Sequence, residues 1–558
     1  MPFSFSAGRS DRRKSKRKSV SLQAKVSILL KQDLSEKRST LNAHVDNIGA
    51  DGLRVVFTQL DRNSDRDILR DMHENRVEIS IPSVLGVDLL AGKIAWVSLA
   101  DGPPQAGIRL DSTNPRIREL LHHYLSRPNA TKYTVGLYKT AWQRRLFPSL
   151  FSLLRDMVVF LVPLRVPQPL VKLLYGTQPR FAFYVHPRRK EDVFISLPFL
   201  NYLRNILPVK WLVALASALP PFVVGYVVHP NQTGVIIGTQ QTPAELLGNV
   251  KRSIKKARAA VRFAAKICPP GSILGLGAWW PIVTRRGLAL KSAGERYGVT
   301  ITNGHCGTLV SIYLMVRKIS KISGIEMGKL HVGIIGVGKM GQNVAHVLNG
   351  TVRKLHLLDV NQKKLANATE KLARLETKTR LETTRVTPTG SEDLRNAFLK
   401  NHLLICTASN IGKVLSEPSL PDRFLLIDDS RPEAFYRSDP HSSRVVIEGG
   451  LMRLRGAGVN YDFGFGIGED VFGCLAESYL LSLDKGGALR PTLGNVELDN
   501  FWRLIEFCQR EHVSVGNFRS GSSLVDDATI AEIVAEKDAS IRDPHSQMGK
   551  PNRTVART

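Results

Sequence analysis

Long apolar runs, paired cysteines and an export signal are all missing from this chain of 558 residues. Arg155-Asp156 and Pro220-Pro221 interrupt its two most apolar regions, so no stretch of about 20 apolar residues remains for a transmembrane helix. The five cysteines are odd in number and show no C-x-x-C spacing, which argues against a disulfide framework and against a zinc site. The N-terminus is basic and polar, with no apolar core behind it. We therefore expect a cytoplasmic protein without a bound metal.

Acidic residues are scarce as well. The chain has 49 Asp and Glu against 78 Lys and Arg, which gives a net charge of +29. Such an excess is typical of a protein with an anionic partner, whether nucleic acid, anionic lipid or an acidic carrier protein, although a generally basic surface gives the same count. At about 150 residues per domain, the length predicts three or four domains.

A glycine turn organises the second half of the chain. His331–Gly341 reads as a buried strand, a turn and the start of a helix, and Gly336, Gly338 and Gly341 supply G-x-G-x-x-G spacing. The next strand ends at Asp359, where an acid would bind a ribose diol. This context favours a dinucleotide-binding βαβ unit over a turn without a ligand.

Strands and helices alternate beyond this turn, which predicts a doubly wound parallel sheet of the Rossmann type followed by C-terminal helices. Ligands of such sheets bind at the carboxyl ends of the strands, here Thr407, Ala408 and Asp428-Asp429. Two glycine-containing loops, 275–284 and 302–308, are predicted to line a cleft.

The first 127 residues predict a small β-barrel with a C-terminal helix over 115–125. Expected strands cover 21–29, 53–57, 77–81, 92–97 and 106–110. Arg13 and Arg17 form R-x-x-x-R within a basic arm, and Asn47-Ile-Gly49-Ala-Asp-Gly52 is close to [DN]-x-S-x-x-G. With Ala91–Trp96 and Gly107–Leu110, these motifs resemble the PilZ domain.

The PilZ resemblance implies cyclic di-GMP as a regulatory ligand. Arg13 and Arg17 would bind its phosphates and guanine edges, and Asn47, Gly49 and Gly52 would form the loop that receives a base. Gly49 replaces the usual serine of this loop, so a PilZ fold that has lost its ligand is the alternative.

Three segments between the predicted domains are apolar or basic. Residues 128–178 read as an amphipathic linker, and Trp211–Val228 reads as core, as an interfacial contact with an anionic membrane, or as the lining of a substrate tunnel. Lys251–Lys266 carries seven bases and no acid at helical spacing, which indicates a solvated helix face or a docking surface for an acidic partner.

Cys474 begins a predicted helix, where the helix N-terminus would lower the thiol pKa and Asp470 and Glu477 would oppose that effect. A small core residue is the alternative reading. The blocks Phe181–His186, Leu276–Val283, Thr302–His305, Cys406–Asn410, Leu426–Asp429, Ile447–Gly450 and Cys474–Glu477 occur in this order. Together they resemble the long-chain acyl-acyl-carrier-protein reductases over residues 180–515.

This resemblance implies that Cys474 is acylated by a fatty acyl thioester of acyl-carrier protein or coenzyme A, and that NADH or NADPH then reduces the acyl group to an aldehyde. The family uses NADPH, whereas Asp359 would repel a 2′-phosphate and favours NADH. The expected partner is the acyl carrier, with a peripheral contact at the inner face of the membrane as a further possibility, and nucleic acid is not expected.

The predicted organisation is a PilZ-like domain (1–127), the linker (128–178), an acyl-substrate domain (179–328), a Rossmann domain (329–460), a helical part with the cysteine (461–520) and a mostly disordered tail (521–558). Two alternative functions remain at this point. One is a cyclic di-GMP-controlled nucleotide-binding regulator without turnover, and the other is a shikimate-type or glutamyl-tRNA-type dehydrogenase.

Overall fold

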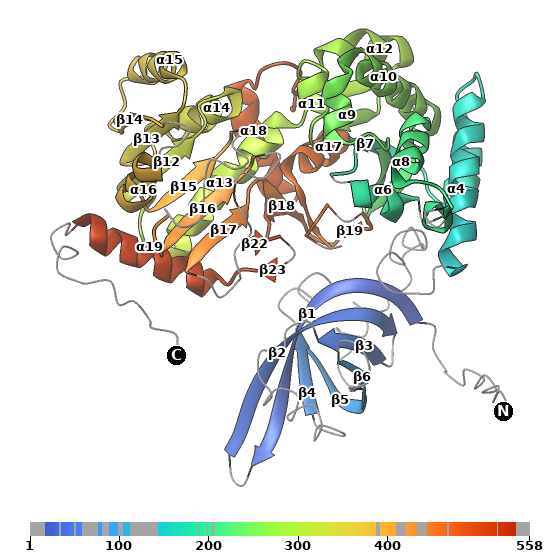
Figure 1. Cartoon of the computed structure of the whole chain (residues 1–558), viewed down its shortest axis with the longest axis horizontal. Helices are drawn as coiled ribbons and strands as arrows, with labels where there is room; N and C mark the ends of the chain where they lie inside the picture. The colour runs from blue at the N-terminus through green and yellow to red at the C-terminus, as the bar shows by residue number, and fades with distance from the viewer. Residues whose placement is uncertain are drawn as a thin grey trace. The chain divides into compact units, whose positions relative to one another are not determined.

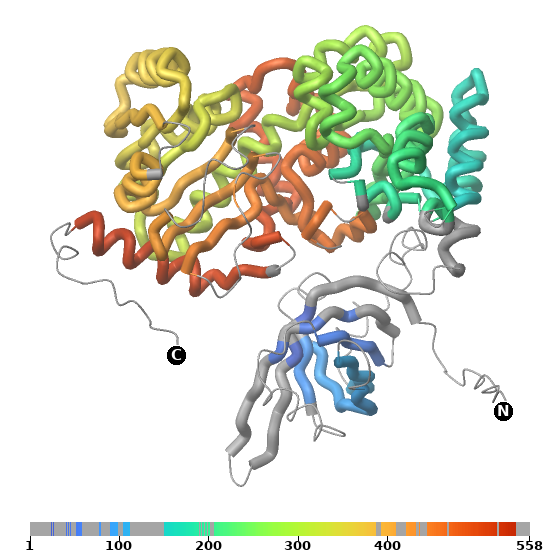
Figure 2. The backbone as a smooth tube through the Cα atoms, viewed as in Figure 1, coloured from blue at the N-terminus to red at the C-terminus, as the bar shows by residue number. Residues whose placement is uncertain are grey.

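The chain forms two compact units in the computed structural model (Figure 1). One comprises Met1–Arg145 with Gly466–Gly468, and the other comprises Leu146–Phe465 with Glu469–Thr558. The structure describes residues 17–32, 35–49, 52–57, 76–80, 89–98 and 104–111 of the first unit. Beyond these segments it describes 143–542 apart from short gaps, of which 387–390, 409–419, 431–434 and 436–442 are the longest (Figure 2).

The first unit is a closed antiparallel barrel. Its strands are β1 (Arg17–Gln32), β2 (Ser35–Gly49), β3 (Gly52–Phe57), β4 (Arg76–Ser80), β5 (Leu89–Ser98) and β6 (Gln105–Leu110). They pair in the order β1-β2-β3-β6-β5-β4, and β4 returns to β1, where Lys25 lies opposite Ser80. Alternating apolar side chains fill the interior, as the period of two in a strand requires, and Val26, Val45, Val55 and Ile94 are fully buried.

Two glycines allow close approach between β5 and β6. A Cβ atom on Gly107 would lie 2.1 Å from the Nε1 atom of Trp96, and one on Gly92 would lie 2.5 Å from the carbonyl oxygen of Arg109. The predicted barrel is confirmed, although β2 was missed because its first half, Ser35–Thr40, is polar. The predicted helix over 115–125 lies outside the described residues.

The second unit contains a doubly wound parallel sheet, as predicted. The strand order is β14-β13-β12-β15-β16-β17, so β13 and β14 lie on one side of β12 and the later strands lie on the other. This reversal creates a switch point between β12 and β15. The strands are β12 (His331–Ile335), β13 (Lys354–Asp359), β14 (Arg380–Arg385), β15 (Leu403–Cys406), β16 (Phe424–Asp428) and β17 (Arg444–Glu448). The helices between them are α14 (Lys339–Leu348), α15 (Gln362–Ala373) and α16 (Ser391–Lys400).

A second six-stranded sheet precedes the Rossmann sheet along the chain, in the order β11-β10-β7-β9-β8-β19. Its strands are β7 (Pro179–Val185), β8 (Phe222–His229), β9 (Gln232–Gly238), β10 (Ile273–Leu276), β11 (Thr300–Thr302) and β19 (Gly458–Val459). Its helices are α4 (Gln143–Leu161), α5 (Gln168–Tyr175), α6 (Lys190–Ser196), α7 (Leu200–Leu203), α8 (Val209–Ala218), α9 (Pro243–Gly248), α10 (Val250–Ile267), α11 (Trp280–Val283) and α12 (Lys291–Tyr297). The basic helix predicted at Lys251–Lys266 is confirmed as α10.

Two helices join the sheets. The long helix α13 (His305–Ser323) packs on α14, whereas α17 (Gly473–Leu483) packs on β7 and β10, and α13 and α17 pack on each other. A small antiparallel sheet of β18 (Leu451–Leu454), β20 (Asp470–Phe472) and β21 (Val513–Val515) lies beside them. One continuous apolar core runs through both sheets and these helices, so the two sheets are held as one body.

The prediction of a mostly disordered tail over residues 521–558 was wrong in part. After α18 (Leu498–Arg510), the chain forms the short strands β22 (Arg519–Ser520) and β23 (Ser523–Leu524) and the helix α19 (Asp527–Arg542). The helix α19 is stabilised by the main core, in which Ile530, Ile533 and Val534 are buried. Its charged sequence alone does not predict a stable helix. Residues beyond 542 lie outside the described residues. Among the described residues, no helix has both the length and the apolar character needed to cross a bilayer.

Candidate functional site

A cavity of about 430 Å³ lies between the two sheets of the second unit. It receives residues from the glycine turn, from the carboxyl ends of β15 and β16, from the loops after β10 and β11, and from the start of α17. The predicted site residues that line it are Gly338, Thr407, Ala408, Asp429 and Cys474. Both loops predicted to line a cleft contribute, through residues such as Trp279 and His305.

The three glycines have different roles in the turn. Gly336 has φ of +88°, and a Cβ atom there would lie 2.7 Å from the Cβ atom of Ala408. A Cβ atom on Gly341 would lie 2.0 Å from the carbonyl oxygen of Gly336. Around Gly338, in contrast, no protein atom lies within 4 Å of that position, and no side chain caps α14 there. The first and third glycines therefore close the turn, while the second leaves space for a phosphate at the helix N-terminus.

Asp359 and Thr407 support the glycine turn from the neighbouring strands. The N–H of Val337 donates to Oδ2 of Asp359 over 2.7 Å, and the N–H of Asn361 donates to its Oδ1 over 2.9 Å. The hydroxyl of Thr407 donates to the carbonyl oxygen of Gly336 over 2.7 Å. These residues fit a dinucleotide: the turn is preformed, it is open at Gly338, and a carboxylate lies at the end of β13.

Cys474 lies at the second position of α17, where three elements approach unusually closely. A Cβ atom on Gly304 would lie 2.2 Å from the Cβ atom of Cys474, and one on Gly307 would lie 2.1 Å from the carbonyl oxygen of Gly473. These glycines bring the start of α13 against the start of α17. Among the five cysteines, all of which are described, Cys474 alone lines the cavity and alone is not fully buried.

The structure shows which of the two opposing effects predicted for the pKa of the Cys474 thiol is larger. Burial first, and then the charges of Asp429 and Glu477, raise the pKa of the Cys474 thiol to about 12, whereas the backbone N–H groups of the helix start lower it. The helix effect is therefore smaller than the combined effect of desolvation and two carboxylates, and the predicted opposition by Glu477 is present. Asp470, the second acid expected to oppose ionisation, instead pairs with Arg519 over 2.8 Å.

Glu477 is buried one turn after the thiol and joins the loops around it. Its carboxylate accepts from the N–H of Gly307 over 2.7 Å, from the N–H of Thr492 over 3.3 Å, and from the hydroxyl of Thr302. Burial raises the pKa of Glu477, and its hydrogen bonds counter that shift. This residue fixes the start of α13 and the loop after β11 in position beside Cys474.

Two histidines near the thiol are neutral at physiological pH. Burial and the charge of Arg286 lower the pKa of His305 to about 4, and its ring lines the cavity. Burial lowers the pKa of His186 to about 4 as well. The His186 ring is held between the carbonyl oxygen of Pro187 and the N–H of Trp279, which donates to Nε2 over 3.2 Å. Both histidines line the cavity in the neutral form, and His186 also orients the loop that contains Trp279.

Sequence reasoning missed Arg286, which lines the cavity with its Nε atom buried and without a hydrogen-bond partner. Arg285 and Arg286 have φ of 54° and 56°, and Ala278 has 50°. Left-handed backbone at non-glycine residues costs energy and clusters at functional sites. The Arg-Arg-Gly sequence after the tryptophan loop was the available signal.

The candidate cyclic di-GMP residues are brought together in the barrel as far as their backbone is described. Arg17 at the start of β1 lies opposite Gly49 at the end of β2, Ser19 lies opposite Asn47, and Gly52 begins the next strand. Arg13 lies outside the described residues. The strand pairing therefore places the end of the basic arm beside the Asn47–Gly52 segment.

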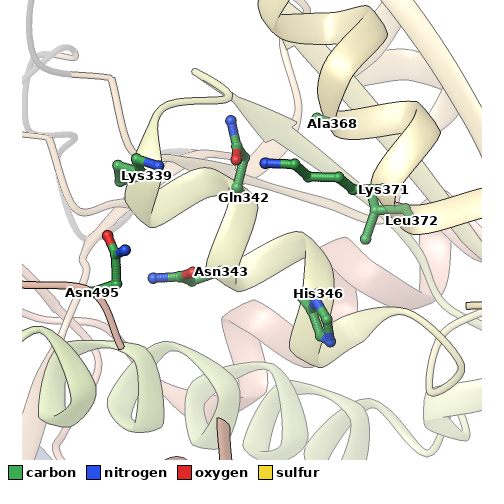
Figure 3. Close-up of a pocket in the computed structure, with 8 residues that line it drawn as sticks. All are labelled: Lys339, Gln342, Asn343, His346, Ala368, Lys371, Leu372 and Asn495. Carbon is green, nitrogen blue, oxygen red and sulfur yellow. The ribbon is translucent and has the colours of Figure 1, made fainter. Parts of the chain in front are cut away.

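A smaller cavity of about 230 Å³ is lined by residues of α14 and α15 and by Asn495 (Figure 3). The side chain of Lys371 extends from α15 toward Gln342 of α14, and Lys339 and His346 also line the space (Figure 3). None of the candidate catalytic or cofactor residues lines it. No cluster of His, Cys, Asp or Glu able to hold a metal occurs in the part of the chain that the structure describes.

Comparison with known families supports the assignment of the glycine turn. Residues 331–401 match the family model described as 3-hydroxyacyl-CoA dehydrogenase, NAD binding domain. This supports a nicotinamide-binding oxidoreductase domain. No curated protein sequence matches the chain.

Similar solved structures fall into two groups. The structure of YcgR with cyclic di-GMP from Escherichia coli is 14% identical, with a TM-score of 0.15, and the match covers 20% of this chain and 44% of YcgR. L-tryptophan dehydrogenase from Nostoc punctiforme is 11% identical, with a TM-score of 0.30, over 65% of this chain and 89% of that one. The 5-ketofructose reductase of Gluconobacter sp. strain CHM43 is 11% identical, with a TM-score of 0.25, over 64% and 98%.

Proposed function

We propose that this protein is a cyclic di-GMP-responsive reductase that converts a long-chain fatty acyl thioester to the aldehyde through an acyl-enzyme on Cys474. The observation that carries the proposal is the shared cavity: Cys474 and the open side of the glycine turn at Gly338 line the same space. A bound reduced nicotinamide supplies the hydride.

The apolar part of the cavity suits an acyl chain. Its lining includes Phe183, Leu276, Trp279, Ile282, Met340, Phe463 and Phe472. Side chains of this kind bind a hydrocarbon by removing its surface from water, at about 25 cal/mol per Å².

The thiol must lose its proton as it reacts, because its pKa is raised. In the proposed step, the sulfur of Cys474 bonds to the acyl carbonyl carbon, the carbon–sulfur bond to the carrier breaks, and the thiol proton passes to the carrier sulfur. His305 is in the neutral form that accepts a proton and is our candidate for carrying it. Hydride addition to the enzyme thioester then breaks the bond to Cys474 and releases the aldehyde.

For the cofactor we propose NADH. Asp359 holds a carboxylate at the end of β13, where it would accept hydrogen bonds from a ribose diol and repel a 2′-phosphate. For the acyl carrier we propose acyl-carrier protein or coenzyme A.

The test is acyl transfer without nicotinamide. The full chain is incubated with a long-chain acyl-CoA, and the protein is digested and analysed by mass spectrometry. We expect an acyl adduct on Cys474, no adduct in Cys474→Ala, and a normal adduct in Cys306→Ala, since Cys306 is fully buried and does not line the cavity. An adduct on Cys306, or no adduct on any cysteine, would overturn the acyl-enzyme.

The raised pKa of Cys474 and the family match at 331–401 favour a second candidate, in which hydride passes directly between the nicotinamide and a substrate carbonyl or alcohol. In that case Cys474→Ala would retain turnover and no adduct would form. A chain that binds NADH but turns over neither substrate class would instead be a nucleotide-binding regulator.

A further inference from the structure

One face of the helix α4 is fixed to the rest of the unit by hydrogen bonds to Asp156. Asp156, fully buried, accepts hydrogen bonds from the side chain of Arg155 over 2.8 Å, from the hydroxyl of Tyr175 over 2.9 Å and from the N–H of Val223 over 2.7 Å. One carboxylate thus ties α4 to α5 and to β8. Removal of a partner from a buried charge is costly, so this face of α4 is fixed.

The end of α4 is held by α10. Nζ of Lys266 donates to the carbonyl oxygens of Val159 and Phe160, over 3.1 and 2.7 Å, and so satisfies the last turn of the helix. The guanidinium of Arg262 lies 4.3 Å from the ring centroid of Phe160. Leu153 joins the apolar cluster that contains Leu212 of α8. The helix therefore has a defined orientation.

The opposite face of α4 is apolar and exposed. Phe151, Leu154, Val158 and Leu161 recur at spacings of three, four and three, which places them on one stripe, and Phe151 and Leu161 are 64% and 76% exposed. Further large exposed apolar side chains lie on the adjoining helices α5 and α8 and are Leu170, Leu173, Trp211 and Leu215. Isolated exposed apolar residues are ordinary, but four on one stripe of a helix mark an interaction surface, and α8 packs beside α4 through Leu212 and Leu153.

The net positive charge of residues 146–230 favours an anionic partner. Over residues 146–230 the sequence has nine bases and three acids. The bases are Arg155, Arg165, Lys172, Arg180, Arg188, Arg189, Lys190, Arg204 and Lys210, and the acids are Asp156, Glu191 and Asp192. Of the acids, Asp156 pairs with Arg155, and Asp192 pairs with Arg188 over 3.5 Å.

We propose that the exposed stripe of α4, with Trp211 of α8, is an interfacial site for an anionic lipid bilayer. Large apolar side chains on a helix with basic flanks insert at the boundary of headgroups and acyl chains, and tryptophan favours that depth. The fixed inner face presents the stripe without a change of fold. Part of the predicted Trp211–Val228 segment is nevertheless core, since Leu212, Val213 and Phe222 are buried.

The test is sedimentation of the full chain with vesicles of phosphatidylcholine alone or with added phosphatidylglycerol. We expect binding to the anionic vesicles, about tenfold weaker for Phe151→Ser with Val158→Ser, because that double change removes about half of the apolar surface of the stripe. Leu375→Ser is the matched control: Leu375 is also an exposed leucine, but it lies beyond α15. Thermal unfolding of each variant checks the fold.

A charge variant separates the two parts of the interaction. Lys172→Glu with Lys210→Glu keeps the apolar stripe and should weaken binding to anionic vesicles while leaving the weak binding to neutral vesicles unchanged. Equal binding by the unaltered chain and the apolar double variant would overturn the proposal. So would absence of vesicle binding by the unaltered chain, which would leave a protein partner as the occupant of this face.

Discussion

Cys474 lies at the predicted start of a helix, and its surroundings in the fold keep its thiol protonated. The helix start is present, but burial and two carboxylates dominate the ionisation of the thiol. A thiol of this kind is stable against adventitious oxidation and reacts when a substrate or a proton acceptor favours ionisation.

The pH dependence of alkylation tests this state. For a group whose pKa is raised to about 12, the thiolate fraction increases about tenfold for each pH unit below that value. We therefore expect the iodoacetamide reaction of Cys474 to accelerate from pH 7 through pH 10 without a plateau, measured by peptide mass spectrometry in the free chain. The urea-unfolded chain, as a reference, should level off near the ordinary cysteine pKa, and a plateau below pH 7 in the folded chain would show a stable thiolate.

Asp359 has a similar double role, since it supports the glycine turn and sets charge at the cofactor ribose. Asp359→Asn removes the negative charge but keeps one acceptor for Val337 or Asn361. We expect the ratio of NADH to NADPH affinity to fall by about tenfold, measured by titration calorimetry with each nucleotide. Asp393→Asn, on α16, is the control and should leave the ratio unchanged, and a strong preference of the unaltered chain for NADPH would contradict our reading of Asp359.

At the scale of elements, substitutions at two glycines of the turn should distinguish a role in stability from a role in ligand binding. Gly341→Ala places a methyl group against the carbonyl of Gly336 and should cost about 2 kcal/mol of unfolding free energy or more. Gly338→Ala meets no protein atom and should change stability by less than about 0.5 kcal/mol, yet weaken NADH binding at least about tenfold.

Urea unfolding and NADH titration measure the two effects. Gly328→Ala is the control, because no atom lies near its Cβ position and it belongs to neither the turn nor the cavity. If Gly338→Ala bound NADH normally, the pyrophosphate would not approach the turn at that residue.

At the scale of the whole molecule, the barrel and the unit with the Rossmann sheet lie on one chain, so a ligand of one can control the other only if it favours one arrangement of the two. We expect cyclic di-GMP to bind and to alter aldehyde formation. Arg13→Ala with Arg17→Ala should abolish both effects and leave basal turnover intact, as measured by calorimetry and by NADH oxidation.

Arg38→Ala is the matched control, because Arg38 is also in the β1–β2 pair but lies opposite Leu29, far along β2 from Asn47. Binding that persists in the double variant would place the ligand elsewhere. No binding by the unaltered chain would indicate that Gly49 has disabled the site.

The sequence by itself determined the features that depend on local spacing. The glycine turn, five of the six strands of the Rossmann sheet, the barrel and the helix at Cys474 follow from periodicities of two and of 3.6 residues and from glycine positions, which are properties of neighbouring residues. The strands β2 and β14 and the helix α19 were missed because their stability comes from pairing and burial against distant segments rather than from their own composition.

Tertiary structure alone decided how the cavity is composed and charged. It brings Cys474 together with Gly338 and His305, which both lie more than 130 residues earlier in the chain, and it places Asp429 where its charge raises the thiol pKa. It also decided that Arg155 and Asp156, which interrupt an apolar run in the sequence, lie buried as a pair while the apolar residues beside them face outward. Desolvation and Coulomb interactions depend on distances in space, which no local pattern contains.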